Sequence, residues 1–179
     1  MTSLILRFFG FPQIWIDQAP IQVKRRKTLA LLAFLAVHDL NELTGMPGRE
    51  EGFRAGRGRE TLAALLWPEC SQEQAGAYLR QALWDFRRAA GEAWIVTDSQ
   101  TIALNPEMDV WVDVNAFGTG MAKWQSGKLD PSETIALLED TIAYYRGDFL
   151  SGFTLRDSPA FDEWQLLQAE RLRLRLGQE

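Results

Sequence analysis

The sequence predicts an α+β domain over residues 1–112 followed by an all-α segment over residues 113–179. Short apolar runs typical of β-strands stand at both ends of the first part and enclose three stretches with helical periodicity. Beyond residue 112 the periodic stretches have the spacing of helices alone. A chain of 179 residues is long enough for one domain with a large core or for two small domains.

Three short strands are expected near the N-terminus, over residues 4–10, 14–16 and 21–23, with turns between them. They would form a small antiparallel sheet whose apolar face requires a covering helix. The next stretch, Arg25–His38, supplies that helix, and its almost uninterrupted apolar composition places it at the centre of the core.

A basic cluster stands at the start of this helix and comprises Lys24, Arg25, Arg26 and Lys27. The helix dipole favours negative charge at this end, so the cluster is unfavourable there unless an anion lies nearby. A DNA backbone phosphate would be such an anion, and these residues are therefore candidate DNA contacts. A solvated basic turn is the equally weighted alternative.

Residues 39–58 contain five glycines and many charges, and they predict a long mobile surface loop. The run GRGRE at residues 56–60 is a weak candidate for a phosphate cradle, because it follows a polar loop and not a strand. A second helix is expected over Arg59–Trp67, and Pro68 ends it.

The stretch Ala75–Gly91 predicts the helix around which the first part is organised, with Ser71 as its N-cap and Gly91 at its end. Its apolar side chains fall on one side and predict a buried stripe made of Ala75, Leu79, Ala82, Leu83, Phe86 and Ala90. The outer side carries the kinds of side chain that contact phosphates and base edges, namely Tyr78, Arg80, Gln81, Trp84, Asp85, Arg87 and Arg88. On composition alone, an ordinary solvated helix face is the alternative.

The order of the elements favours the DNA-binding interpretation. Two helices joined by a short turn, the second with a polar and basic face, are typical of a helix-turn-helix. Residues 93–105 then predict a β-hairpin around Asp98-Ser99-Gln100, in the position of a wing. Residues 109–113 predict one more strand or an extended crossing.

Three helices are expected in the second part, over residues 113–125 with Asp113 as cap, over residues 132–145, and over residues 161–176. The last of them carries apolar residues with too little partner surface in this chain, namely Trp164, Leu167, Leu172 and Leu176. A helical array that stops on an unpaired helix predicts that further helices followed.

Composition excludes several classes of protein. No apolar run approaches the ~20 residues that span a bilayer, and no signal peptide is recognisable, so we expect a cytoplasmic protein. Cys70 and His38 are the only residues of their types, which excludes an internal disulfide and a cysteine or histidine metal centre. No hydrolase or nucleotide-binding motif occurs. We therefore expect no enzymatic activity, no cofactor and no metal.

Several runs together resemble a known family. RRKTLALLAFLAVH, RETLAALLWPE, AYLRQALWDFRRAAG and WIVTDSQTIALN occur in the order of an OmpR-like winged helix. The later run YYRGDFLSGFTLRDSPAFDEWQLLQAERLRLR resembles the opening of a bacterial transcriptional activator domain. This pairing resembles the SARP-type transcriptional activators over nearly the whole chain. It implies a winged helix-turn-helix domain followed by tetratricopeptide-like helices, in an N-terminal fragment of a longer regulator.

The resemblance also implies partners and site residues. The partners would be double-stranded promoter DNA with direct repeats, bound by a homodimer, and RNA polymerase. The outer side of the central helix would contact DNA, with Arg87 and Arg88 nearer the backbone. The wing would contribute Thr97, Asp98, Ser99 and Gln100, and the segment 67–74 would face the polymerase through Glu69, Ser71 and Gln72.

Some features depart from the family pattern or weigh against DNA. The net charge is −5, the loop 39–58 is unusually long, and the wing tip has no arginine to enter a minor groove. Asp85 would repel phosphate, although it could accept a hydrogen bond from cytosine. The alternative is a winged-helix protein-interaction module with weak or no DNA binding, in which Trp84 and Tyr78 anchor a partner.

Overall fold

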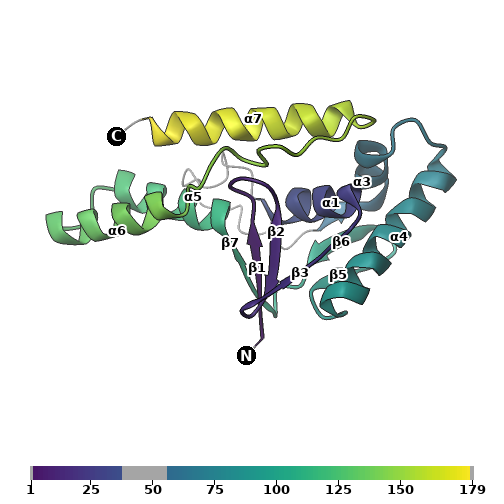
Figure 1. The fold of residues 1–179 in the computed structure, drawn as a ribbon, viewed down its shortest axis with the longest axis horizontal. Coiled ribbons are helices and arrows are strands. Elements are labelled where there is room, and N and C mark those ends of the chain that lie inside the picture. The colour runs from purple at the N-terminus through teal and green to yellow at the C-terminus, as the bar shows by residue number, and fades with distance from the viewer. Residues whose placement is uncertain (1, 38–55, 178–179) are drawn as a thin grey trace.

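The computed structural model describes residues 2–37 and 56–177. Most of the predicted loop 39–58 lies outside the described residues. The described helices and strands follow in the order β1 Ser3–Arg7, β2 Gln13–Ile16, β3 Ala19–Ile21, α1 Arg26–Ala36, β4 Arg57–Gly58, α3 Arg59–Leu66, α4 Gln72–Ala90, β5 Ile95–Thr97, β6 Thr101–Leu104, β7 Asp109–Val112, α5 Asp113–Gln125, α6 Pro131–Ala143 and α7 Pro159–Leu176. This mixed α/β architecture and its order of elements agree with the prediction (Figure 1).

The N-terminal sheet contains four strands in the order β3-β2-β1-β7. β2 pairs antiparallel with both β1 and β3, as the sequence predicts. β7 pairs with β1 in parallel, with Ser3 opposite Asp109. The three N-terminal strands therefore form the predicted antiparallel sheet, and β7, the strand expected over residues 109–113, adds a parallel strand to it. β1 also ends at Arg7, earlier than the predicted strand over residues 4–10.

A second sheet has the order β4-β6-β5. β5 and β6 form the predicted hairpin, with Ile95 opposite Leu104. β4 pairs antiparallel with β6, so Arg57 and Gly58 are a short strand and not the end of a loop. A Cβ atom at Gly56 would lie 3.0 Å from the Thr101 side chain, so the glycine allows this close approach.

The core lies where α1, α3 and α4 pack together beside the two sheets. α1 has eight buried residues along its length, as expected of a helix that is apolar almost all round. The buried side of α4 is the predicted stripe, with Ala75, Leu79, Ala82, Leu83 and Phe86 buried. Ser71 accepts a hydrogen bond from the Gln74 amide, and the Gln74 side chain accepts one from the Ser71 amide, which closes a capping box. The opposite, polar side of α4 is thereby turned to solvent.

Asp113 is buried at the junction between the sheet and the second part. Its carboxylate accepts hydrogen bonds from the amides of Phe8, Phe9 and Val114 at 2.8–3.1 Å. Arg146 lies 3.4 Å away. Burial raises the pKa of Asp113 despite these hydrogen bonds. The N-cap of α5 is Val112, so the prediction that Asp113 caps this helix is wrong. Asp113 is the first residue of the helix, and its carboxylate bonds the two residues after β1 as well as Val114.

α5 and α6 form a helix pair that extends to one end of the molecule in Figure 1, whereas α4 lies at the other end. A Cβ atom at Gly120 would overlap the Thr141 side chain, so the two helices approach closely at this glycine. Thr141 is the one fully buried side chain of α6. Two of its apolar residues, Ile135 and Ile142, are 59% and 39% exposed.

α7 lies back along the body of the molecule (Figure 1). The Trp164 ring contacts Phe34, Phe149 and Phe161 with centroid distances of 5.0–5.6 Å, and Leu172 is buried. The prediction that α7 lacks partners is therefore wrong for Trp164 and Leu172, because α7 packs against α1 and the connection before it. Leu167 is half exposed, as the prediction of an unpartnered side chain requires.

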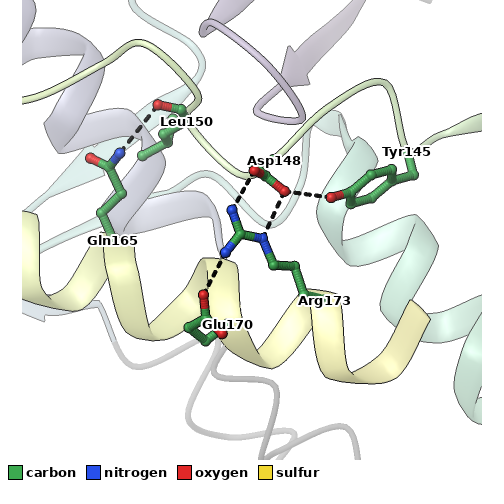
Figure 2. A network of polar contacts seen from close by, with 6 residues as sticks. All are labelled: Tyr145, Asp148, Leu150, Gln165, Glu170 and Arg173. Carbon is green, nitrogen blue, oxygen red and sulfur yellow. Dashed lines mark hydrogen bonds and ion pairs between the residues drawn. The ribbon is translucent and has the colours of Figure 1, made fainter. Parts of the chain in front are cut away.

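A polar network joins α7 to the connection that precedes it, residues 144–158 (Figure 2). The Arg173 guanidinium donates to both oxygens of Asp148, at 2.9 and 2.5 Å. Tyr145 donates its hydroxyl to Asp148 at 2.6 Å, and Gln165 donates to the carbonyls of Leu150 and Phe153. The hydrogen bonds from Arg173 and Tyr145 lower the pKa of Asp148 to about 2.

The buried Asp113 generates a prediction about stability. Substitution of Asp113 with alanine leaves the buried amides of Phe8 and Phe9 without acceptors, so the free energy of unfolding should fall by about 2 kcal/mol or more. Asp113→Asn keeps one acceptor oxygen and should lose less. Urea denaturation followed by tryptophan fluorescence measures both variants. Equal stability of Asp113→Ala and the wild type would show that these bonds contribute nothing.

Asp148 generates a prediction about acid unfolding. Its pKa falls from 3.8 to about 2 on folding, so it stabilises the native state above pH ~4. That contribution is lost as the pH falls from about 4 to about 2. Asp148→Asn should therefore be less stable at neutral pH and should lose less stability over this range than the wild type. Thermal unfolding at pH 2.5, 3.5, 4.5 and 7 measures the difference, and parallel curves would contradict the assignment.

Candidate nucleic-acid interface

The outer side of α4 presents the side chains that the sequence singled out. Tyr78 and Trp84 are 48% and 52% exposed, which is unusual for large aromatic side chains. Arg80 and Arg88 are exposed as well, and the Arg88 guanidinium lies 5.1 Å from the centre of the Trp84 ring. This contact between a cation and an aromatic face holds Arg88 beside Trp84 at the surface.

Asp85 is neutralised within the protein. Arg25, at the start of α1, forms an ion pair with its carboxylate at 2.6 Å. Gln81, one turn earlier on α4, donates its side-chain amide to the same carboxylate at 3.1 Å. The structure thus brings three of the predicted site residues together, and Arg25 offsets the repulsion that Asp85 would exert on a phosphate.

A basic hollow separates α4 from the β5–β6 hairpin. Its volume is about 560 Å³, and its lining includes four arginines and one acidic residue; the residues of this basic hollow are Arg59, Arg80, Leu83, Trp84, Arg87, Arg88, Glu92 and Thr97. An open hollow with this excess of guanidinium groups suits an anionic polymer backbone or another anion.

Arg87 and Arg59 are positioned by the hairpin. Arg87 donates to the carbonyl of Ile95 at 3.3 Å and to the hydroxyl of Thr97 at 3.4 Å. Arg59 donates its guanidinium to the carbonyl of Asp98 at 3.1 Å. Both side chains therefore connect a helix to the hairpin, and their charge remains at the hollow because carbonyl acceptors do not neutralise it.

Arg59 is a residue that sequence reasoning missed. The signal was the GRGRE run, which was a weak candidate because no strand was expected before it. In the structure β4 supplies a short strand, and Arg59 begins α3 directly after it. The expectation that no strand precedes this helix is therefore wrong, whereas the predicted start of the helix at Arg59 is confirmed.

The predicted wing tip is held by hydrogen bonds among its own residues. The Asp98 carboxylate accepts hydrogen bonds from the amides of Gln100 and Thr101 and from the Thr101 hydroxyl, at 2.6–2.9 Å. These bonds lower the pKa of Asp98. Thr97, Ser99 and Gln100 are exposed. The tip of the hairpin therefore presents a carboxylate and neutral side chains.

The residues of the basic cluster at the start of α1 contact two different parts of the molecule. Arg25 faces α4, as described above. Arg26 instead donates to the carbonyl of Thr154 at 2.9 and 3.1 Å, and its guanidinium lies 4.6 Å from the centre of the Phe153 ring. Lys24 is exposed. Arg26 is thus occupied by the second part of the chain, away from the outer side of α4.

The segment before α4 holds the residues predicted to face the polymerase. Ser71 closes the capping box, and Gln72 donates to the Glu60 carboxylate of α3 at 2.9 Å. Glu69 is exposed at the turn. The segment is thus held by both helices of the turn, and it leaves a polar surface beside the start of α4.

Within residues 2–37 and 56–177, no three histidine, cysteine or carboxylate side chains are grouped as a metal site would need. No helix of the same described ranges has the length and apolar character to cross a bilayer.

Comparisons with known proteins show a likeness to a solved structure. No protein-family model and no curated protein sequence matches the chain. A solved structure of EmbR from Mycobacterium tuberculosis, in complex with a low-affinity phosphopeptide, superposes with a TM-score of 0.65 at 17% sequence identity. The match covers 98% of this chain and 44% of EmbR, so the chain spans less than half the length of that protein. This likeness concerns the fold, and it supports the SARP-like fold predicted from the sequence.

Proposed function

We propose that this protein is a transcriptional regulator that binds DNA with α4 in the major groove. The basic hollow between α4 and the hairpin is the observation that carries this proposal. Its arginines come from α3 and α4, and Glu92 and Thr97 from the segment up to the end of β5 complete its lining, in the order of a helix-turn-helix with a wing. The fold shared with EmbR supports a regulator of this class.

The arginines of the hollow differ in how they are held, and we assign them different contacts with DNA. Arg59 and Arg87 are fixed by carbonyl acceptors and would form a rigid positive wall for a phosphate. Arg80 and Arg88 are exposed and would reach toward the duplex. Gln81 and Trp84 lie between them on the outer side of α4 and would contact base edges. The hydrogen bond from Gln81 to Asp85 would have to open before Gln81 could read an adenine bidentately.

The finer assignments rest on the family resemblance. Activation, binding to direct repeats as a homodimer and recruitment of RNA polymerase through Glu69, Ser71 and Gln72 belong to this proposal. So does the division into a DNA-binding domain over residues 1–112 and a helical activator domain from residue 113. Placement of Glu69 at an exposed turn beside α4 supports the polymerase-facing role.

A second candidate function is favoured by one observation. The predicted wing tip carries a carboxylate and no basic side chain, and Tyr78 and Trp84 are exposed aromatic anchors. A protein partner would use these anchors without needing the arginines. The two functions differ in their dependence on salt, because phosphate binding releases counterions and an aromatic protein interface does not.

The first test of this function uses arginine removal. Arg80→Ala and Gln81→Ala should each lower the affinity for the native upstream DNA by about 1–3 kcal/mol. Arg80→Ala should also reduce the slope of log K against log salt by about one unit. Fluorescence anisotropy with a labelled duplex measures both quantities. Lys128→Ala removes the same charge between α5 and α6 and serves as the matched control. Unchanged binding by both α4 variants would contradict the assigned face.

The second test uses the internal ion pair. Asp85→Asn frees Arg25 and keeps a side chain that can bond Gln81. Affinity for a scrambled duplex should rise, and the salt slope should steepen by about one unit, because one more cation contacts phosphate. The ratio of specific to non-specific affinity should fall. An unchanged slope would show that Arg25 lies outside the DNA interface.

A further inference from the structure

A second cavity lies on the other side of α4 from the basic hollow. It occupies the seam between the start of α1, α4 and the connection at residues 154–157, and its volume is about 620 Å³. That volume lies within the range of ordinary small-molecule sites. Its walls come from both parts of the chain, and of its lining residues the functions proposed above use Arg25 and Tyr78.

The cavity surrounds the N-terminal end of α1. This helix has 11 residues, no acidic residue in its first turn and no side chain that caps its first amides. Four basic residues line the cavity, Arg25, Arg26, Lys27 and Arg156. Arg25 is paired with Asp85 and Lys27 with Asp157, so Arg26 and Arg156 supply the positive charge that no carboxylate of the described residues pairs with. A helix N-terminus surrounded by cations favours an anion.

Thr28 provides an independent indication of a ligand. It lies in the first turn of α1, lines the cavity and is fully buried. Its hydroxyl has no hydrogen-bond partner among the described residues. A buried hydroxyl without a partner is unfavourable, so a group that bonds it on binding would gain that energy.

The remaining walls are apolar and aromatic. Trp67 and Tyr78 lie with their ring centres 6.1 Å apart and their planes inclined by 31°. Ala82 and Leu155 continue this surface. A ligand that fits the whole cavity therefore has a flat apolar body as well as an anionic group.

We propose that this cavity binds a small aromatic phosphate of about the size of a mononucleotide, with its phosphate at the start of α1 and its ring against Trp67 and Tyr78. The Thr28 hydroxyl would donate to a phosphate oxygen, and Arg156 would neutralise part of the charge. The proposal stands on the cavity and does not depend on DNA binding.

The test uses the 179-residue chain without DNA. Titration with the four 5′-mononucleotides, followed by amide chemical shifts, should move the signals of Arg26 to Leu29 and the Trp67 indole for at least one nucleotide. The matching nucleoside and inorganic phosphate should each bind at least ten-fold more weakly, because each lacks half of the recognised ligand. Shifts confined to Arg80 and Arg88, or no shifts with any mononucleotide, would overturn the proposal.

A pair of variants separates binding from folding. Thr28→Val is isosteric and removes only the hydroxyl, so the protein should remain at least as stable while the nucleotide binds about three- to ten-fold more weakly. Arg156→Ala should also weaken binding, and Lys128→Ala, which removes a charge far from the cavity, should not. Equal affinity of Thr28→Val and the wild type would overturn the site at the start of α1.

Discussion

The buried carboxylate of Asp113 is the constraint on which the arrangement of the whole chain depends. A buried charge is unfavourable unless donors surround it. Three backbone amides and Arg146 supply these donors, and they come from the end of β1, the start of α5 and the connection after α6. One side chain thereby fixes where the first strand ends and where the second part begins.

The same junction is reinforced along the next residues of the chain. The amide of Leu150 donates to the carbonyl of Phe8 at 2.8 Å, and the amide of Gly10 donates to the carbonyl of Asp148 at 3.0 Å. The strand therefore continues past β1 by pairing with the connection before α7. The Asp148 carboxylate, on this connection, also holds Arg173 of α7, so the N-terminal strand and the last helix share one residue as support.

Both ends of α1 are bonded to the second part. Arg26 and Lys27 bond Thr154 and Asp157 at its start, and Asn115 donates to the carbonyl of Ala36 at its end. α1 in turn packs against α4. The orientation of α4 therefore depends on contacts that extend across the whole molecule. A change in position of residues 154–157 would move α1, and α1 packs against the helix that carries the candidate DNA-binding face.

Local periodicity predicted most of the fold. α4, its N-cap at Ser71, its buried stripe and the hairpin all follow from residues close together in the sequence, and the structure confirms them. The parallel pairing of β7 with β1 and the role of Asp113 depend on residues about 105 positions apart, which local patterns do not encode. The same limit applies to the candidate site. The outer side of α4 was predictable, whereas the Arg25–Asp85 pair and the place of Arg59 required the tertiary structure.

The close approach at Gly120 has a consequence for the shape of the helical part. α5 and α6 touch at a point where one residue has only a hydrogen atom, so their mutual angle is set by the absence of a side chain. The far end of this pair, the turn at residues 126–130, projects from the body. The size of the residue at position 120 therefore limits how closely α5 and α6 approach each other. A methyl group at position 120 would push the two helices apart and change the direction in which the turn at residues 126–130 points. A partner that contacts this turn would then meet the same residues in a different orientation.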